Sequence, residues 1–393
     1  MTHPVKWAKS SMRAAPVLSG SPGSLATAIS AFLTTGFGAR TASSCVVAGG
    51  VATITLSSDP DNSTLVDTVV SVGGAESPMT ALNGEHRVLA ANSTTLQFAT
   101  TAADGTATGT VTVKTAAVGW QSLFAGAITN VLALKPSVPE ATGCVLRIDD
   151  TGTINARVRA YEAMTDISSG VGVTPLESQC SGGLWWPKSN TANATARPWF
   201  IVADDRGVYL AVAPQGTDRY TLIYTGDVAS LKSGDAYGFA ITGNQADQTA
   251  AVAAPDGCCG YSHRSARTGA YLVRAHTAIG QAIAAQRIGS HHNGDTAGVY
   301  AGSAGYSYGT YPNGPNNGLL TGALELVATG IRGTLPGLLH PVQDCGNAFA
   351  SGAVVDGTDA LAGRKLLALR VAPPSGSSTP GTVFLDITGP WER

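Results

Sequence analysis

Two apolar runs joined by a short polar turn place the strongest constraint on how this chain can fold. Residues 199–203 form the first run, 204–207 form the turn, and 208–213 form the second run. Apolar runs of this length around a turn that ends in glycine are typical of adjacent antiparallel strands. A third strand-like run follows at 219–225. The sequence therefore predicts the centre of an antiparallel sheet here.

The preceding residues extend the same β-pattern. Residues 144–148 and 155–162 alternate roughly between apolar and polar side chains, and they flank a turn at 149–152 that contains Asp149 and Asp150. Such alternation predicts strands with one buried face. We therefore expect the stretch 143–231 to be a β scaffold around which the rest of the chain is organised.

The small number of charged residues suggests what surrounds this scaffold. Of the 393 residues, 13% are charged, against an average of about 25% in soluble proteins, and 48 are glycine. A surface with so few charges favours coverage by other subunits. The alternative is a monomeric all-β protein rich in small residues.

Charge and hydropathy bear on the partners and the location of the chain. The net charge of −2 provides no electrostatic basis for binding nucleic acid. No apolar run reaches the length of about 18 residues that a membrane span needs, and residues 1–7 lack the pattern of a signal peptide. We therefore expect synthesis in a cytoplasm. There, the six scattered cysteines would be free thiols, most of them buried. We expect no cofactor.

The expected fold class is mainly β, in three parts. Residues 1–40 form an N-terminal arm and a short helix, 41–118 a small immunoglobulin-like β-sandwich, and 119–393 a larger antiparallel β domain with long loops at 244–318. The sandwich is predicted from six or seven short strands between turns. A closing hairpin is expected from 365–371 and 382–387.

Two helices are predicted. In the segment 22–36, Ser21 or Ser24 can cap a helix, and apolar side chains recur on one face at Leu25, Ile29, Phe32 and Leu33. A second helix is predicted at 275–286.

Several motifs resemble catalytic ones, but each has a simpler interpretation. Residues 305–309 fit G-x-S-x-G, yet loop sequence flanks them where a nucleophile elbow needs a strand and a helix. The pairs Asp149-Asp150 and Asp204-Asp205 fall at hairpin turns, where aspartate caps the backbone. Asp59, Asp61 and Asn62 match a calcium loop only in part. We therefore predict that no catalytic residue is present.

Metal-ligand residue types gather in two places. These are Cys258 and Cys259 with His263, and His291 and His292 with Asp295. Both lack the paired spacing of a structural zinc site. We therefore predict buried thiols and exposed histidines, and no metal.

Aromatic residues are the better candidates for contacts with partners. They are Trp7, Trp185, Trp186, Tyr306, Tyr308 and Tyr311. Such side chains can stack on sugar rings or anchor a subunit interface. We favour the interface.

Several short sequence segments, taken together, resemble those of a known group of proteins. Residues 5–7 with 15–20, and 386–391, resemble uncharacterised virion proteins of tailed bacteriophages, which are encoded among the tail and baseplate genes. Residues 81–88 with 105–111 are similar to small β-sandwich modules of phage tail proteins. The resemblance spans most of the chain and implies a structural role without catalytic residues.

The sequence thus predicts a non-enzymatic structural subunit of a tailed-phage virion, in the tail tip, baseplate or fibre attachment region. We expect a symmetric homo-oligomer, such as a trimer or hexamer, whose subunits contact one another through residues 1–37 and the loop 302–318. Other phage tail proteins are further expected partners. One alternative is a receptor- or glycan-binding tail component that uses Trp185, Trp186 and the loop that carries Tyr306, Tyr308 and Tyr311. The other is a hydrolase of surface polysaccharides.

Overall fold

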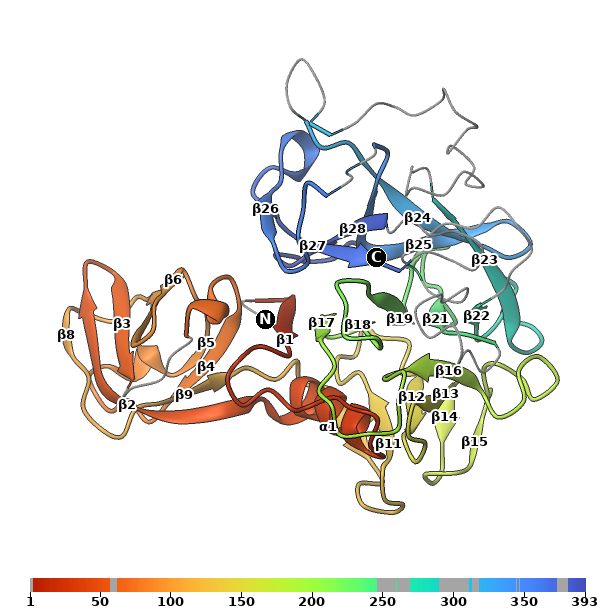
Figure 1. Ribbon diagram of the computed structural model, residues 1–393, viewed down its shortest axis with the longest axis horizontal. Helices are drawn as coiled ribbons and strands as arrows, with labels where there is room; N and C mark the ends of the chain where they lie inside the picture. The colour runs from red at the N-terminus through yellow and green to blue at the C-terminus, as the bar shows by residue number, and fades with distance from the viewer. Residues whose placement is uncertain are drawn as a thin grey trace.

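The chain folds mainly into antiparallel β-strands with one short α-helix near its N-terminus, as the sequence predicts (Figure 1). The structure is a computed structural model and describes residues 3–56, 62–245, 259, 269–289, 311–312, 318–343, 345, 347–372 and 381–393. Within these residues, strands form three larger sheets and one small hairpin.

The largest sheet contains 13 of the described strands. Their order is β1-β17-β18-β19-β21-β22-β23-β24-β25-β28-β27-β26, and β20 pairs with β25. The strands are β1 (Lys6–Lys9), β17 (Trp199–Ala203), β18 (Gly207–Val212), β19 (Thr221–Asp227), β20 (Ala229–Ser230), β21 (Phe239–Thr242), β22 (Ala270–Leu272), β23 (Ile283–Gly289), β24 (Thr321–Val327), β25 (Ile331–Pro341), β26 (Val354–Asp356), β27 (Lys365–Val371) and β28 (Gly381–Asp386).

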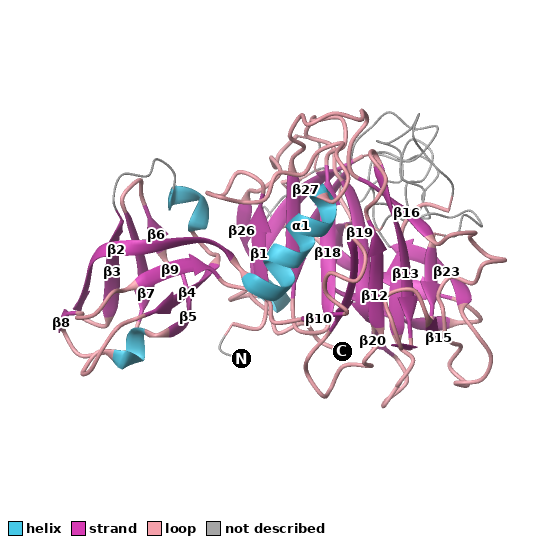
Figure 2. Cartoon of the chain, turned by 90° about the horizontal axis from the view of Figure 1, so that it is seen from below, coloured by secondary structure: helices cyan, strands magenta, loops and turns pink. Residues whose placement is uncertain are grey.

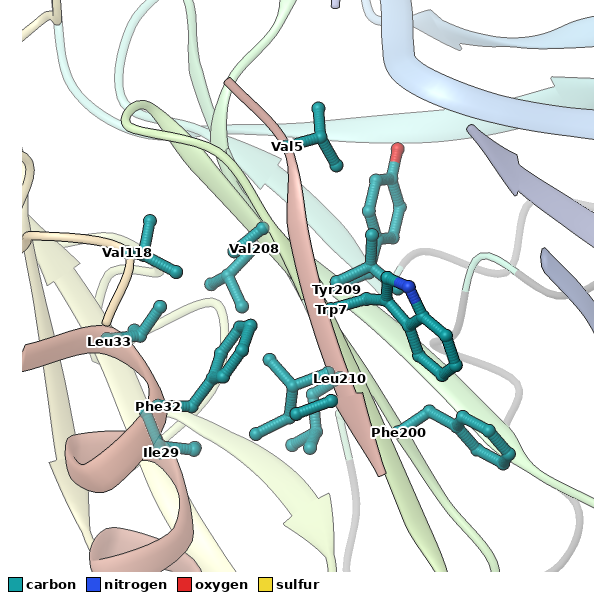
Figure 3. Packing of buried hydrophobic residues seen from close by; sticks show 14 of the residues in the cluster. Val5, Trp7, Ile29, Phe32, Leu33, Val118, Phe200, Val208, Tyr209 and Leu210 are labelled. Carbon is teal, nitrogen blue, oxygen red and sulfur yellow. The ribbon is translucent and has the colours of Figure 1, made fainter. Parts of the chain in front are cut away.

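The predicted central hairpin is confirmed as β17–β18, with β19 as its next neighbour. Every residue of these three strands is buried. Side chains alternate between the two faces of a strand, and Figure 3 shows Leu210 on one face and Tyr209 on the other. Both faces are therefore covered by other parts of the chain.

The second half of the largest sheet covers the Tyr209 face. The Tyr209 hydroxyl donates to the carbonyl oxygen of Pro336 in β25 at 2.8 Å. At the far end, the Tyr220 backbone NH donates to the carbonyl oxygen of Arg370 in β27 at 2.8 Å. The sheet therefore folds back on itself into two layers.

A five-stranded sheet and the helix cover the other face. This sheet has the order β10-β11-β12-β13-β16 and comprises β10 (Gln121–Leu123), β11 (Val131–Lys135), β12 (Val145–Asp149), β13 (Asn155–Tyr161) and β16 (Leu184–Pro187). The helix α1 (Ser24–Ser30) continues as a π-helical segment, η1 (Ala31–Thr35). Phe32 of this segment points toward Val208 and Leu210 of β18 (Figure 3). We call these three layers together the body.

The helix confirms the prediction for 22–36, but its capping differs. Leu25, Ile29, Phe32 and Leu33 are all buried. The capping predicted for Ser21 or Ser24 is wrong, because the N-cap residue is Gly23 and the Ser24 hydroxyl donates to the carbonyl oxygen of Ser19.

Residues 37–115 form a separate small lobe, at the left of Figures 1 and 2. Its eight described strands are β2 (Phe37–Ala48), β3 (Val51–Leu56), β4 (Val69–Gly73), β5 (Gly84–Arg87), β6 (Ala90–Ala91), β7 (Thr95–Ala99), β8 (Gly105–Thr106) and β9 (Thr112–Thr115), with short 3-10 turns η2 (Asn62–Leu65) and η3 (Thr80–Leu82). The long strand β2 pairs with β9 near its start and with β3 and β8 farther along, so it joins two layers. His86 and Phe98 stack across the layers with ring centroids 4.1 Å apart. The lobe is a β-sandwich, and its likeness to immunoglobulin domains stays a prediction.

The remaining elements are short. β14 (Ala163–Met164) and β15 (Gly170–Val171) form the small hairpin, and η5 (Asp359–Leu361) is a 3-10 turn. The predicted closing hairpin is confirmed by the pairing of β27 with β28.

Two predictions about local structure are wrong. Residues 275–286 do not form a helix, because the chain turns there and enters β23, which pairs with both β22 and β24. Residues 6–9 are not a free arm, because β1 adds to the edge of β17 in its own chain.

Candidate functional site

Two of the predicted contact aromatics lie inside the chain. Trp7 is 3% exposed and its indole NH donates to the carbonyl oxygen of Asp67 at 3.0 Å. Trp186 is 1% exposed and donates to the carbonyl oxygen of Thr242 at 2.7 Å. Buried indoles usually find such a hydrogen-bond partner. Neither ring reaches the surface, so neither can stack on a sugar or contact a neighbouring subunit.

Trp185 lies on the outer face of the five-stranded sheet and is half-buried. The Arg157 guanidinium stacks over its ring at 3.7 Å from the centroid. The same guanidinium donates to the carbonyl oxygens of Gly183, at 2.6 Å, and Ser181. The guanidinium covers one face of the indole ring, so a sugar could stack only on the other face.

Of the three predicted tyrosines, the structure describes Tyr311. Tyr311 packs against Phe349 with ring centroids 4.8 Å apart. Tyr306 and Tyr308 lie outside the described residues, as does the G-x-S-x-G match at 305–309.

The first aspartate pair divides into one turn residue and one core residue. Asp149 accepts from the Thr151 hydroxyl at 2.7 Å, as a turn aspartate should. Asp150 is fully buried and accepts from the backbone NH groups of Leu25, at 2.8 Å, and Ala26, at 3.0 Å. The turn role predicted for Asp150 is therefore wrong, because its side chain caps α1 instead.

A buried lysine completes this cap. The Lys188 ammonium donates to the second carboxylate oxygen of Asp150, and both side chains are 0% exposed. Burial raises the pKa of Asp150 and lowers the pKa of Lys188, while their mutual attraction opposes both shifts. The Asp150 carboxylate accepts hydrogen bonds from three donors, and these hydrogen bonds favour its charged form.

The second aspartate pair also holds the fold together. Asp204 accepts from the backbone NH of Gly207 at 2.8 Å, which confirms its predicted turn role. Its carboxylate also binds Arg393 through two hydrogen bonds of 2.5 and 2.9 Å. The pKa of Asp205 is raised, mainly because the side chain is partly buried and secondly because the negative charge of Asp204 lies nearby.

A polar cavity of about 480 Å³ opens beside these residues. Its lining includes Glu140, Thr142, Arg206, Lys232, Asp235 and Arg393. Arg206 donates to Asp227 at 2.9 Å, and Asp227 also accepts from the Thr142 hydroxyl at 2.6 Å. Most of the lining charges are therefore neutralised by ion pairs within the chain.

Most of the residues whose types could bind a metal lie outside the described part of the chain. This applies to Cys258, His263, His291, His292 and Asp295, and also to Asp59 and Asp61. Among the described residues, no group of three or more His, Cys, Asp or Glu side chains could hold a metal ion. The five described cysteines are buried, as predicted.

Cys259 and His340 form a buried contact. Burial raises the pKa of the Cys259 thiol to about 12. The His340 Nε2 atom lies 2.9 Å from the carbonyl oxygen of Cys259, and because a carbonyl only accepts, Nε2 carries the proton. His340 is 0% exposed, and burial lowers its pKa to about 4.

Three exposed apolar side chains lie on segments of the body that are neighbours in the fold. They are Leu231, Ile279 and Ile331, which are 70%, 77% and 47% exposed. The segments that carry them are neighbours, since the Leu231 NH donates to the carbonyl oxygen of Arg332 at 3.0 Å and the Lys232 ammonium donates to the carbonyl oxygen of His276 at 2.6 Å. We call these three residues the apolar end patch. Sequence reasoning missed it, because three distant segments form it.

No protein-family model matches the chain, and no curated protein matches it significantly. In the described part of the chain, no helix has the length and apolar character required to cross a bilayer.

The Asp150–Lys188 pair generates a stability prediction. Asp150→Ala leaves the buried Lys188 ammonium unpaired and α1 uncapped, so it should lower the free energy of unfolding by about 3–5 kcal/mol. Asp149→Ala, one residue earlier and in the turn, should cost about 1 kcal/mol or less. Urea denaturation of both variants makes the comparison, and equal losses would contradict the role assigned to Asp150.

His340 generates a pH prediction. Because its pKa is lowered from 6.5 to about 4 in the folded state, the unfolded chain binds a proton that the folded chain excludes. Stability should therefore fall as the pH drops from about 6.5 toward about 4. His340→Gln should flatten this fall in urea denaturation at pH 7 and pH 5, with His276→Gln as the control for losing a less buried histidine. The same fall in wild type and His340→Gln would sink the prediction.

Proposed function

We propose that this chain is a non-enzymatic structural subunit of a tailed-phage virion that assembles as a symmetric homo-oligomer. The tail tip, the baseplate and the fibre attachment region are the proposed positions. The observation that carries the proposal is the apolar end patch, on a chain of which only 13% of the residues are charged. Exposed apolar patches mark sites of protein–protein contact.

The apolar end patch is held in a fixed shape by ion pairs. Arg332, next to Ile331, binds Asp235 at 2.8 Å, and their side chains are 0% and 5% exposed. Arg274 binds Glu162 at 2.5 Å, and it also donates to the carbonyl oxygen of Ala278, next to Ile279. A pre-organised surface loses less conformational entropy on binding. This rigidity supports an interface that is formed before assembly.

The roles of the buried carboxylates support a structural function as well. Asp150, Asp204 and Asp235 each bind a cation from a distant part of the chain. Each contact joins separate elements of the fold, so these carboxylates have structural partners within the chain. The resemblance to tailed-phage virion proteins points the same way.

The structure bears on which segments of the chain can contact neighbouring subunits. Residues 6–9 and the apolar face of α1 are covered by the chain's own sheets. We therefore add the apolar end patch to the proposed interface, beside the exposed part of residues 1–37, where Val17 is 62% exposed. The loop 302–318 lies mostly outside the described residues.

Charge substitutions in the apolar end patch test assembly. Leu231→Lys with Ile279→Lys should convert the oligomer to monomers, because buried, unpaired ammonium groups oppose association. The mass is measured by light scattering after size-exclusion chromatography. Leu89→Lys, at a 56% exposed position in the small lobe, is the matched control and should keep the oligomer. A monomeric wild-type protein, or a double variant that keeps the wild-type mass, would refute the proposed assembly.

Trp185 with its stacked Arg157 favours a second candidate function, the binding of a host cell-surface glycan. Trp185→Ala should then reduce glycan binding on an array by at least about tenfold, the effect of losing about 1.4 kcal/mol. Val46→Ala, an exposed change in the small lobe, controls for surface alteration. Equal binding by both variants, or none by the wild type, would remove this candidate.

A further inference from the structure

The small lobe joins the body through two short crossings. The first is Gly36, between η1 and β2, and the second is residues 116–117, after β9. On the lobe side Phe37 pairs with Thr115, and on the body side the Val118 NH donates to the carbonyl oxygen of Phe32 at 3.0 Å. The lobe is therefore connected at a single narrow point.

The first crossing requires glycine. Gly36 has φ +72°, and a Cβ atom there would lie 2.3 Å from the carbonyl oxygen of Thr115. Only glycine adopts this conformation without strain and lets the two crossings run so close together. We call these two adjacent crossings, Gly36 and residues 116–117, the hinge.

A cavity lies beside this hinge. It measures about 520 Å³, and its lining includes Lys6, Thr35, Glu85, Lys114 and Gly119. The lobe and the body are thus not closely packed at this point. Their relative orientation has to be set by specific contacts.

Lys6 of β1 makes the central contact. Its side chain is 3% exposed, and its ammonium group donates at 2.5 Å both to Glu85 of the lobe and to the carbonyl oxygen of Ala117 in the second crossing. The backbone of Lys6 pairs with Ala203 in the body. One buried cation therefore links the body, the hinge and the lobe.

The residues beside Lys6 add two further contacts. The Trp7 indole donates to the carbonyl oxygen of Asp67 in the lobe at 3.0 Å. Arg87 of the lobe donates to the carbonyl oxygens of Asp67, at 2.7 Å, and Val5, at 3.1 Å. The contacts that reach β1 from the lobe fall on three consecutive residues, 5–7, and the Lys114 ammonium of the lobe also donates to the carbonyl oxygen of Thr35 beside the hinge at 2.8 Å. Lys365 of the body also lies 3.9 Å from Asp67 of the lobe, but its side chain is exposed, so this ion pair contributes little to holding the lobe in place.

We propose that β1 is a latch that fixes the small lobe on the body, and that the lobe swings about Gly36 and residues 116–117 when the latch contacts are lost. The latch belongs to β1 because this strand is bound to β17 by backbone pairing and to the lobe by side chains. This inference rests on the geometry of the joint and not on the proposed function.

The test removes the lobe's side of the latch and leaves β1 on its sheet. Glu85→Ala with Arg87→Ala eliminates the lobe side chains that bind Lys6 and Val5, and leaves the contacts of Lys6 with Ala117 and of Trp7 with Asp67. Small-angle X-ray scattering of the full chain should then show a larger maximum dimension and the profile of two bodies joined flexibly, where the wild type scatters as one rigid particle. Glu76→Ala, an exposed lobe carboxylate, is the matched control and should scatter like the wild type.

A milder variant guards against misfolding. Glu85→Gln keeps an oxygen acceptor at a side chain that is 30% exposed and should give an intermediate broadening. Circular dichroism establishes that each variant is folded. Folded variants whose scattering curves superimpose on that of the wild type would overturn the latch, as would a wild-type chain that already scatters as two flexible bodies.

Discussion

The burial of β17, β18 and β19 on both faces is the constraint on which the rest of the structure depends. Nearly all their side chains are apolar or aromatic, and each residue is buried. Burial of apolar area contributes about 25 cal/mol per Å², so these strands are stable only when both faces are covered. The chain covers one face with the five-stranded sheet and α1, and the other with the β24–β28 half of the same long sheet. The three-layered body follows from this requirement.

Buried ion pairs then determine how the layers meet. Asp150–Lys188 places α1 on the five-stranded sheet, Asp204–Arg393 holds the C-terminal residue on the central hairpin, and Asp235–Arg332 joins the turn after β20 to β25. A buried charge is costly unless it is paired with good geometry. In a chain with few charges, each pair therefore favours one arrangement of distant segments over the others. This is why aspartates whose spacing suggests catalysis can have structural roles.

The sequence predicted elements whose signal is local. The hairpin at 199–213 has both its strands and its turn residues within fifteen positions, and the apolar face of α1 follows from the spacing of Leu25, Ile29 and Phe32. Predictions failed where the deciding partner is distant. Residues 275–286 have an apolar pattern that fits a helix, but pairing with β22 and β24 outweighs such weak local preferences. Ser21 and Ser24 are good capping residues, yet Asp150 caps α1 from 125 positions away.

By itself, the sequence determined that the chain is mainly β, where its central hairpin lies and that its helix has one apolar face. Each of these follows from the side-chain alternation or composition of a short segment. Only the tertiary structure decided which tryptophans are buried, which aspartates carry ion pairs, and that residues 6–9 close a sheet and hold the small lobe. These outcomes depend on contacts such as Lys6 with Glu85, which are 79 positions apart. Folding brings such residues together through the packing of whole layers, and no local pattern in the sequence encodes that contact.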